Sequence, residues 1–267
     1  MFLVTGGTGT LGRHVVPLLR EAGAEVRILT RQMIPGHLTG DLETGLGLDE
    51  ALVGVDTVLH LAGSPKNDEQ KAAHLVRAAG RARKPHIVYI SVVGCERVPV
   101  TSAIDRGMFG YFQRKRAAEV VIAESGLPWT TLRATQFHDL AFKTVNGMAK
   151  LPVIPVPSGL SWQPIETGEV ADRLVELAHG APAGLVDDIA GPREYGMAEF
   201  VRGFLAATGK HRVLLPIRLP GGAARAFREG ANLAPDHAVG VRTWEDFLAE
   251  RTSPSGRSSM VTTRTAP

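Results

Sequence analysis

A tyrosine and a lysine stand four positions apart in the segment GYFQRKRAAE, as Tyr111 and Lys115. On a helix, positions i and i+4 share a face, so this spacing would present a phenol and an ammonium together. A phenol has a pKa of about 10, and a close cation favours its ionised form. The spacing alone is only suggestive of a paired site, because the same spacing also arises by chance.

A glycine-rich turn at the start of the chain indicates dinucleotide binding. Residues 1–12 read MFLVTGGTGTLG, an apolar strand that runs into the turn, and the following LGRHVVPLLREAG has helical apolar spacing. Glycines permit a tight turn and close approach to a pyrophosphate, and N–H groups at a helix N-terminus face phosphates. The alternative is a structural turn in another α/β protein. The residues expected at the cofactor are Gly6, Gly9, Thr10, Leu11 and Gly12, with Gly7 completing a second glycine frame.

The end of the second expected strand favours NADP over NAD. An NAD site places an acidic residue there for the ribose 2′-OH, whereas an NADP site uses a cation for the 2′-phosphate. This chain has Arg31 at that place and no acid between Glu25 and Asp41. Arg13 is a second candidate cation, and Asp41 is expected near the adenine. The alternative for Arg31 is a solvated residue at a strand end.

The remaining elements alternate and predict an α/β fold with a doubly wound parallel sheet. Strands are expected over 25–31, 56–63, 86–91 and 128–134, with a weakly marked one near 37–42, and helices over 67–83 and about 107–125. Such alternation gives right-handed βαβ units. Pro17 is expected to remove a hydrogen bond from the first helix and to kink it.

A change of pattern at about residue 150 predicts a substrate-binding lobe. LPVIPVPSGLSWQP is rich in proline and irregular, and helices are expected near 168–179, 196–209, 221–231 and 242–250. VDDIA and RVLLP are candidate edge strands. We expect residues 1–250 to form one NAD(P)-binding Rossmann-like domain that includes this lobe. Residues 251–267 lack apolar periodicity and are expected to be disordered.

Composition favours a cytoplasmic protein without nucleic-acid or membrane partners. The chain has 30 Lys and Arg against 27 Asp and Glu, and residues 251–267 alone hold three of the arginines, so we assign the excess to the tail rather than to a basic face. No apolar run approaches the roughly 20 residues of a membrane span, and we expect no secretory leader. Cys95 is the single cysteine, and the histidine spacings do not favour a metal site.

The chain resembles the short-chain dehydrogenase/reductase superfamily, in its atypical, NmrA-like branch. The resemblance covers roughly residues 1–250 and rests on TGGTGTLGR, LTR, GVDTVLHLAG, YISVVG, YFQRKRAAE and SGLPWTTLRATQF. It implies that Tyr111 is the general acid toward a carbonyl oxygen, and that Lys115 binds the ribose and lowers the phenol pKa. It also implies further cofactor contacts, on the adenine and ribose side from Leu61, Ala62 and Gly63, and on the nicotinamide side from Ala134, Thr135 and Phe137.

The chain departs from the superfamily pattern at one expected catalytic position. The superfamily serine that polarises the carbonyl falls a residue or two past Ser91, where this chain has Val92 and Val93. Ser91 is therefore either catalytic or a hydrogen-bonding residue near the cofactor. His138 is a candidate for a role at the substrate, whereas His60 is expected to be a core residue. An apolar pocket is a further expectation, lined by Phe109, Phe112, Phe137, Met148 and Trp162.

The expected function is that of an NADPH-dependent oxidoreductase. The resemblance implies hydride transfer to a carbonyl or quinone of a small apolar or aromatic substrate, because the family contains quinone and azo-dye reductases. It also contains members that bind NADP only as regulators, so an NADP-sensing regulatory protein is the main alternative. An epimerase with a retained cofactor is a third. The oligomeric state, monomer or homodimer, is left open.

Overall fold

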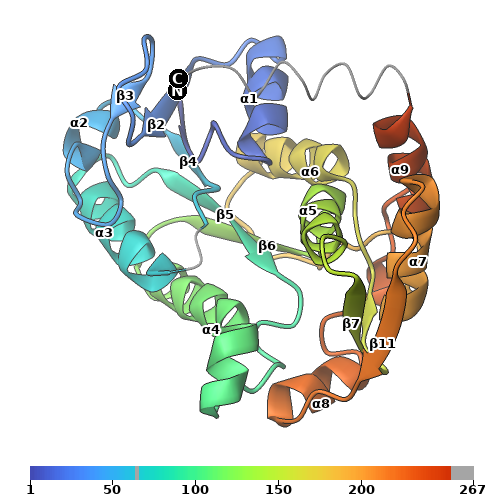
Figure 1. Cartoon of the computed structure of the whole chain (residues 1–267). Helices are drawn as coiled ribbons and strands as arrows, with labels where there is room; N and C mark the ends of the chain where they lie inside the picture. Colours follow the sequence, from blue (N-terminus) through green and yellow to red (C-terminus); the bar gives the residue numbers. More distant parts are fainter. Residues whose placement is uncertain (64–65, 254–267) are drawn as a thin grey trace.

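The computed structural model describes residues 1–63 and 66–253, and a seven-stranded parallel sheet forms its centre (Figure 1). Each strand pairs with its neighbours in parallel, in the order β3-β2-β1-β4-β5-β6-β9. The strands are β1 (Phe2–Thr5), β2 (Val26–Thr30), β3 (Leu38–Thr39), β4 (Thr57–His60), β5 (His86–Val92), β6 (Trp129–Ala134) and β9 (Gly184–Leu185). The order reverses beside β1, so the crevice for a ligand is expected at the carboxyl ends of β1 and β4.

Helices cover both faces of the sheet, which explains why β4 and β5 are apolar runs rather than alternating strands. On one face, α3 (Asp68–Arg81) packs beside α4 (Ala103–Ala123), with the short α2 (Leu48–Ala51) next to them. On the other face, α1 (Gly12–Glu21) packs beside α6 (Thr167–His179). Each layer buries its own apolar cluster against the sheet.

These elements confirm the predicted fold class and its strands. Pro17 lies inside α1 on its exposed side, and the helix continues past it to Glu21. α4 begins four residues earlier than expected, at a capping box in which Ser102 and Asp105 bond each other's backbone N–H.

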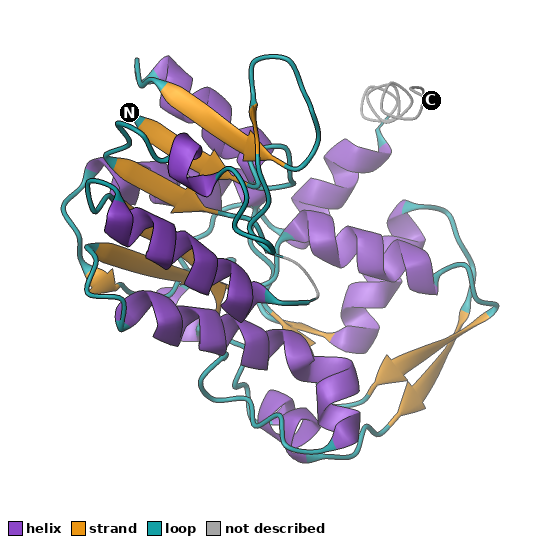
Figure 2. Ribbon diagram, turned by 90° about the vertical axis from the view of Figure 1, so that its left-hand side faces the viewer, coloured by secondary structure: helices purple, strands orange, loops and turns teal. Residues whose placement is uncertain are grey.

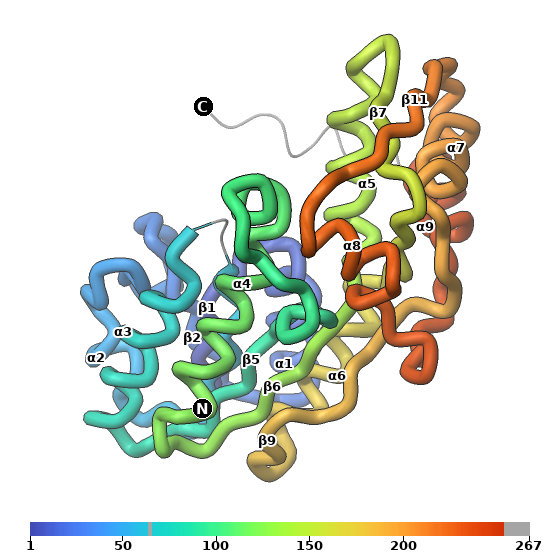
Figure 3. The backbone as a smooth tube through the Cα atoms, turned by 90° about the horizontal axis from the view of Figure 1, so that it is seen from below, coloured from blue at the N-terminus to red at the C-terminus, as the bar shows by residue number. Residues whose placement is uncertain are grey.

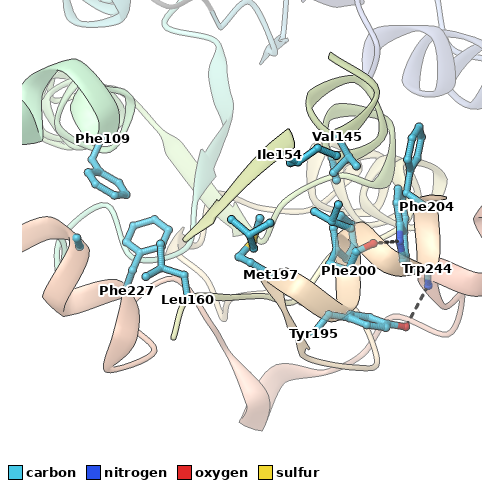
Figure 4. Close-up of a cluster of buried hydrophobic side chains, with 14 of the residues drawn as sticks. Phe109, Val145, Ile154, Leu160, Tyr195, Met197, Phe200, Phe204, Phe227 and Trp244 are labelled. Carbon is cyan, nitrogen blue, oxygen red and sulfur yellow. Dashed lines mark hydrogen bonds between the residues drawn. The ribbon is translucent and has the colours of Figure 1, made fainter. Parts of the chain in front are cut away.

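The C-terminal part of the chain, with α5, forms a lobe beside the sheet (Figure 2). Its core is aromatic: Trp244 stacks on Phe200 at 4.2 Å between ring centroids, and Tyr195 accepts from the Trp244 backbone N–H (Figure 4). The elements of the lobe are α5 (His138–Met148), β7 (Val153–Pro157), β8 (Ser161–Trp162), β10 (Tyr195–Gly196), α7 (Met197–Ala207), β11 (Val213–Ile217), α8 (Gly222–Arg228), a 3₁₀ turn (Pro235–His237) and α9 (Trp244–Thr252).

The expectation of an irregular segment after residue 150 was wrong, because the segment contains β7 and β8. RVLLP is confirmed as a strand: it overlaps β11, which pairs with β7 in a separate two-stranded parallel ribbon. VDDIA follows the edge strand β9 and runs beside β6, where Val186 and Ile189 donate backbone N–H groups to Thr131 and Arg133. Figure 3 shows the ribbon at the side of the lobe away from the sheet.

The expected tail also begins later than residue 251. Arg251 belongs to α9, and its guanidinium lies 2.8 Å from the Asp139 carboxylate. The expectation of disorder for the rest of the tail falls on residues 254–267, outside the described residues. Among residues 1–63 and 66–253, none of the helices has the length and apolarity required to cross a bilayer.

Candidate functional site

The glycine turn between β1 and α1 sits directly against the end of β4. Gly6 has φ +73°, and a Cβ there would lie 2.8 Å from the Ala62 backbone nitrogen. A Cβ on Gly12 would lie 2.4 Å from the Gly6 carbonyl oxygen. These approaches are closer than any side chain permits, so both positions require glycine. The sequence prediction of close backbone packing is thereby confirmed at Gly6 and Gly12.

The start of α1 presents backbone donors without partners. The N–H groups of Thr10, Leu11 and Gly12 donate to no group among the residues that the structure describes. No side chain caps the helix at Leu11, and its first turn holds no acidic residue. Unsatisfied donors and the positive end of a helix dipole together favour an anion. The turn therefore fits the pyrophosphate of a dinucleotide.

A cation that the sequence analysis missed also reaches this turn. Lys143 on α5 donates to the Thr10 hydroxyl oxygen at 3.4 Å, across 133 positions of sequence. Lys143 carries no motif in the sequence, because its place depends on how α5 crosses over the carboxyl ends of the strands. Its ammonium adds positive charge where the phosphates are expected.

Arg31, which was predicted to favour NADP, follows β2, and Asp41, which was expected near the adenine, follows β3. Arg31 is exposed and forms no ion pair within the described part of the chain. Asp41 stands in a turn, where its carboxylate accepts from the Glu43 backbone N–H at 2.9 Å. Arg13 donates to the Thr8 carbonyl oxygen at 3.3 Å, so it is held beside the turn.

Lys115 is buried between α3, α4 and β5. Its ammonium donates to the Ile90 carbonyl oxygen at 2.9 Å and lies 4.0 Å from a carboxylate oxygen of Asp68. A Cβ on Gly63 would be 3.4 Å from the same nitrogen, so the ammonium lies beside the end of β4. Burial lowers the pKa of Lys115, and the Asp68 carboxylate opposes that shift.

Tyr111 lies one turn before Lys115 on α4, as the spacing predicted. The Lys115 nitrogen is 5.9 Å from the centre of the Tyr111 ring, and the ring itself is 38% exposed. Desolvation of the phenol, and then the Asp68 carboxylate, raise the pKa of Tyr111. The expected lowering by Lys115 is therefore absent from this structure, because the ammonium is turned toward Ile90 and Asp68.

The Ser91 hydroxyl is buried and lies 3.8 Å from the Cys95 sulfur, which donates to Glu119 of α4 at 3.2 Å. Glu119 in turn accepts two hydrogen bonds from Arg133, at 2.8 and 2.7 Å. Burial raises the pKa of Cys95, so this thiol remains protonated. The surroundings favour a structural role for Ser91 over a catalytic one.

The residues expected at the nicotinamide lie at the end of β6 and in the segment that follows it. Ala134 ends β6 and is buried, Thr135 donates its backbone N–H to Ile189, and Phe137 precedes the first residue of α5. The Thr135 hydroxyl is buried and has no hydrogen-bond partner within the described residues. Leu61 and Ala62, at the end of β4, are half-buried, while Gly63 is exposed.

The two histidines that the sequence analysis discussed are both buried. His60 shares a hydrogen bond of 2.8 Å with the Thr5 hydroxyl, which fits the expected core role. His138 lies 3.3 Å from the Glu166 carboxylate and packs against the rings of Trp244 and Phe247. These contacts belong to the core of the lobe and favour a packing role for His138.

The aromatic residues expected to line a pocket belong mainly to the core of the lobe. Phe109 and Phe112 pack against Phe227 at 4.8 and 5.2 Å between centroids, and Trp162 packs on Phe200. Met148 is half-buried against the same cluster.

A family model described as NAD(P)H-binding matches residues 6–179. A (4-alkanoyl-5-oxo-2,5-dihydrofuran-3-yl)methyl phosphate reductase of Streptomyces griseus is 33% identical over 165 residues, covering 58% of this chain and 54% of that protein. An NAD(P)H azoreductase of Xenophilus azovorans is 26% identical over 267 residues, covering 90% of each chain. The chain thus spans about half the length of the first relative and most of the second.

Solved structures with the same fold include nucleotide complexes. An NADPH-dependent quinone oxidoreductase from Escherichia coli, complexed with NADPH, superposes with a TM-score of 0.78 at 16% identity, covering 95% of this chain and 100% of that one. A triphenylmethane reductase of Citrobacter, complexed with NADP(H), gives a TM-score of 0.72 at 17% identity, covering 94% and 99%. At these identities the likeness establishes the fold, which is Rossmann-like.

Proposed function

This chain belongs to the NAD(P)H-binding family, and on that premise we propose that it is an NADPH-dependent reductase of a carbonyl or quinone in a small apolar or aromatic molecule. The names of both reductase relatives support an oxidoreductase. The observation that carries the proposal is the placement of Lys115: a buried ammonium at the ends of β4 and β5, with Tyr111 one helical turn away.

The residues around the glycine turn would hold the nucleotide. The unpaired N–H groups of Thr10, Leu11 and Gly12 bind the pyrophosphate, and Lys143 adds a charge-assisted contact. Arg31 binds the 2′-phosphate, since it is exposed and its guanidinium forms no ion pair among the described residues. Lys115 binds the nicotinamide ribose, and the Thr135 hydroxyl accepts or donates to the carboxamide. The bound cofactor supplies the hydride.

Tyr111 supplies the proton in this proposal. The phenol is protonated at neutral pH, as a general acid must be, although burial raises its pKa and so weakens it as an acid. For Lys115 to stabilise the phenolate that remains after transfer, its ammonium would have to turn toward Tyr111 from Ile90 and Asp68, which it contacts in this structure. Phe137, which is half-buried at the start of α5, then offers an apolar surface for an aromatic acceptor.

The experiment is NADPH oxidation against a panel of quinones and ketones. We expect turnover with at least one quinone or aromatic ketone, and loss of most of it in Lys115→Met. Glu69→Gln, a change at an exposed residue of α3, is the matched control and should leave the rate unchanged. NADPH that binds tightly but is not oxidised with any acceptor would overturn the reductase.

One observation favours a second candidate, a protein that senses NADP without turnover. The position where the superfamily has its carbonyl-polarising serine falls at Val92 or Val93, and both are buried apolar residues. Neither side chain can donate to a substrate oxygen. The same panel separates the candidates, because a sensor would retain NADPH affinity and show no oxidation.

A further inference from the structure

The β7–β11 ribbon has an apolar face that the described residues leave partly exposed. In the register Val213 pairs with Val153, and Leu215 with Pro155, so each pair shares a face. Ile154 and Val156 are buried in the core of the lobe, where Figure 4 shows Ile154 among the apolar side chains. The alternate residues form the opposite side, here called the ribbon face: Val153, Pro155, Pro157, Val213, Leu215 and Ile217.

The ribbon face contains no polar side chain; Val153, Val213 and Leu215 are exposed, and Pro155, Pro157 and Ile217 are half-buried. Val213 is 65% exposed, Leu215 52% and Val153 42%, and Leu151 just before β7 is 48% exposed. A solvated strand face normally carries polar residues, so six apolar positions on one side are unusual for a surface. The ribbon stands at the rim of the lobe, where Figure 2 shows the two strands clear of the helices.

The two segments that contain the ribbon are poor in acids. Residues 140–165 and 200–228 hold eight Lys and Arg and no Asp or Glu, and acids resume directly outside them at Asp139, Glu166, Glu199 and Glu229. The sequence analysis assigned the basic excess to the tail, and these two segments are a second basic stretch.

Cations flank the ribbon face at both ends. Lys150 and Arg212 lie at the start of the two strands and Arg218 at the end of β11, and all three are exposed. None of them forms an ion pair with a residue that the structure describes. An anionic membrane surface has negatively charged headgroups above apolar acyl chains. Cations beside an apolar strip can therefore bind the headgroups while the strip contacts the acyl chains.

We propose that the ribbon face docks on an anionic membrane surface. A second copy fits less well, because a two-fold pairing places the same patch on both sides and brings Lys150 and Arg212 toward the partner copy's basic residues. Nucleic acid fits less well, because the exposed residues are aliphatic and offer no aromatic ring on which a base could stack.

The contact is shallow and needs no membrane span. The ribbon leaves backbone groups unpaired at its strand edges, and such groups cannot enter hydrocarbon without a large cost. Only the side chains of the ribbon face reach the acyl boundary, while the flanking cations stay among the headgroups. The expectation of no membrane partner rested on the length of apolar runs, which a surface contact does not require.

The test is flotation of the full chain with vesicles of phosphatidylcholine, alone or mixed with phosphatidylglycerol. We expect binding to the mixed vesicles only, weakening as salt shortens the Debye length from about 10 Å to about 3 Å. Lys150→Gln and Arg218→Gln should each weaken binding about fivefold, and Val213→Ser with Leu215→Ser on the order of tenfold or more.

Matched controls use residues of the same kind elsewhere. Arg20→Gln with Arg77→Gln removes two exposed cations, and Val239→Ser with Val241→Ser removes two exposed valines. Both controls should bind vesicles as the wild type does, and all variants should keep their melting temperature and NADPH affinity. Three results would overturn the proposal: equal binding to both vesicle types, a dimer in sedimentation that Leu215→Ser dissociates, or duplex DNA binding that needs only the cations.

Discussion

The ammonium of Lys115 and the carboxylate of Asp68 face each other at 4.0 Å, and each side chain is less than 5% exposed. Asp68 is the first residue of α3, whereas Lys115 lies in the middle of α4, so two neighbouring helices supply one buried charge pair. A buried cation is costly without a counter-charge. Asp68 therefore stabilises the positive charge of Lys115, and the proposed contact between Lys115 and the ribose requires that charge.

Asp68→Asn should weaken NADPH binding increasingly as pH rises. Burial already lowers the pKa of Lys115, and loss of the carboxylate lowers it further, so the ammonium deprotonates at a lower pH than in the wild type. The groups facing Lys115 are Asp68 and Lys71 on α3, Tyr111 and Glu119 on α4, and Cys95 and Tyr89 from β5 and its loop.

Above the new pKa, affinity should fall on the order of 10- to 100-fold, which is the worth of a charge-assisted contact. Titration of NADPH across pH measures this, with Asp68→Glu as the conservative rescue and exposed Asp49→Asn as control. Parallel pH profiles for wild type and Asp68→Asn would contradict the role.

Tyr111→Phe should separate binding from proton transfer. The ring still packs on Phe112, so NADPH affinity should stay near the wild-type value. Turnover on the best acceptor should fall roughly 10²- to 10⁴-fold, the usual contribution of a general acid. Steady-state kinetics with parallel cofactor titration measures both, and undiminished turnover would remove Tyr111 from the mechanism.

Arg31→Asp should reverse the cofactor preference. The wild type should bind NADPH on the order of 10- to 100-fold more tightly than NADH, because the guanidinium pairs with the 2′-phosphate. The variant replaces that cation with the acid typical of an NAD site. Arg20→Asp, another exposed arginine, should leave the ratio of affinities unchanged. Equal affinities for both cofactors in the wild type would contradict the assignment.

Gly12→Ala should damage both the turn and nucleotide binding. Its Cβ would meet the Gly6 carbonyl oxygen at 2.4 Å, so the helix must move from the turn at a cost of about 1 to 3 kcal/mol. Gly80→Ala is the matched control, because α3 has open space there, and it should stabilise by up to about 1 kcal/mol. Thermal unfolding and NADPH titration of both variants check the contrast.

His60 should make the protein sensitive to mild acid. Burial, then the charges of Lys115 and Lys71, lower the pKa of His60 to about 3, whereas in the unfolded chain it titrates near 6.5. Between those values the unfolded state binds more protons, so the free energy of unfolding rises with pH up to about 6.5 and is level above it. Denaturant titrations across that window should show a shallower rise in His60→Gln, and an identical slope would contradict the assignment.

The sequence was sufficient for the central sheet because local signals there agree with the tertiary structure. The strand before Gly6 is apolar and the glycines have no steric alternative, so the turn and α1 were predictable. Lys143 and Asp68 were not, because their roles depend on helices that meet only in the folded chain. β7 was missed because its prolines resemble a loop, and they are tolerated in a two-stranded ribbon whose edges are open.

A single helix joins the nucleotide turn to the ribbon. Lys143 of α5 touches Thr10, and α5 leads within a few residues to Lys150 and the start of β7. If two ligands bind near the same helix and one alters the affinity for the other, the effect is equal in both directions. Whatever factor vesicle attachment imposes on NADPH affinity, NADPH must impose on vesicle affinity.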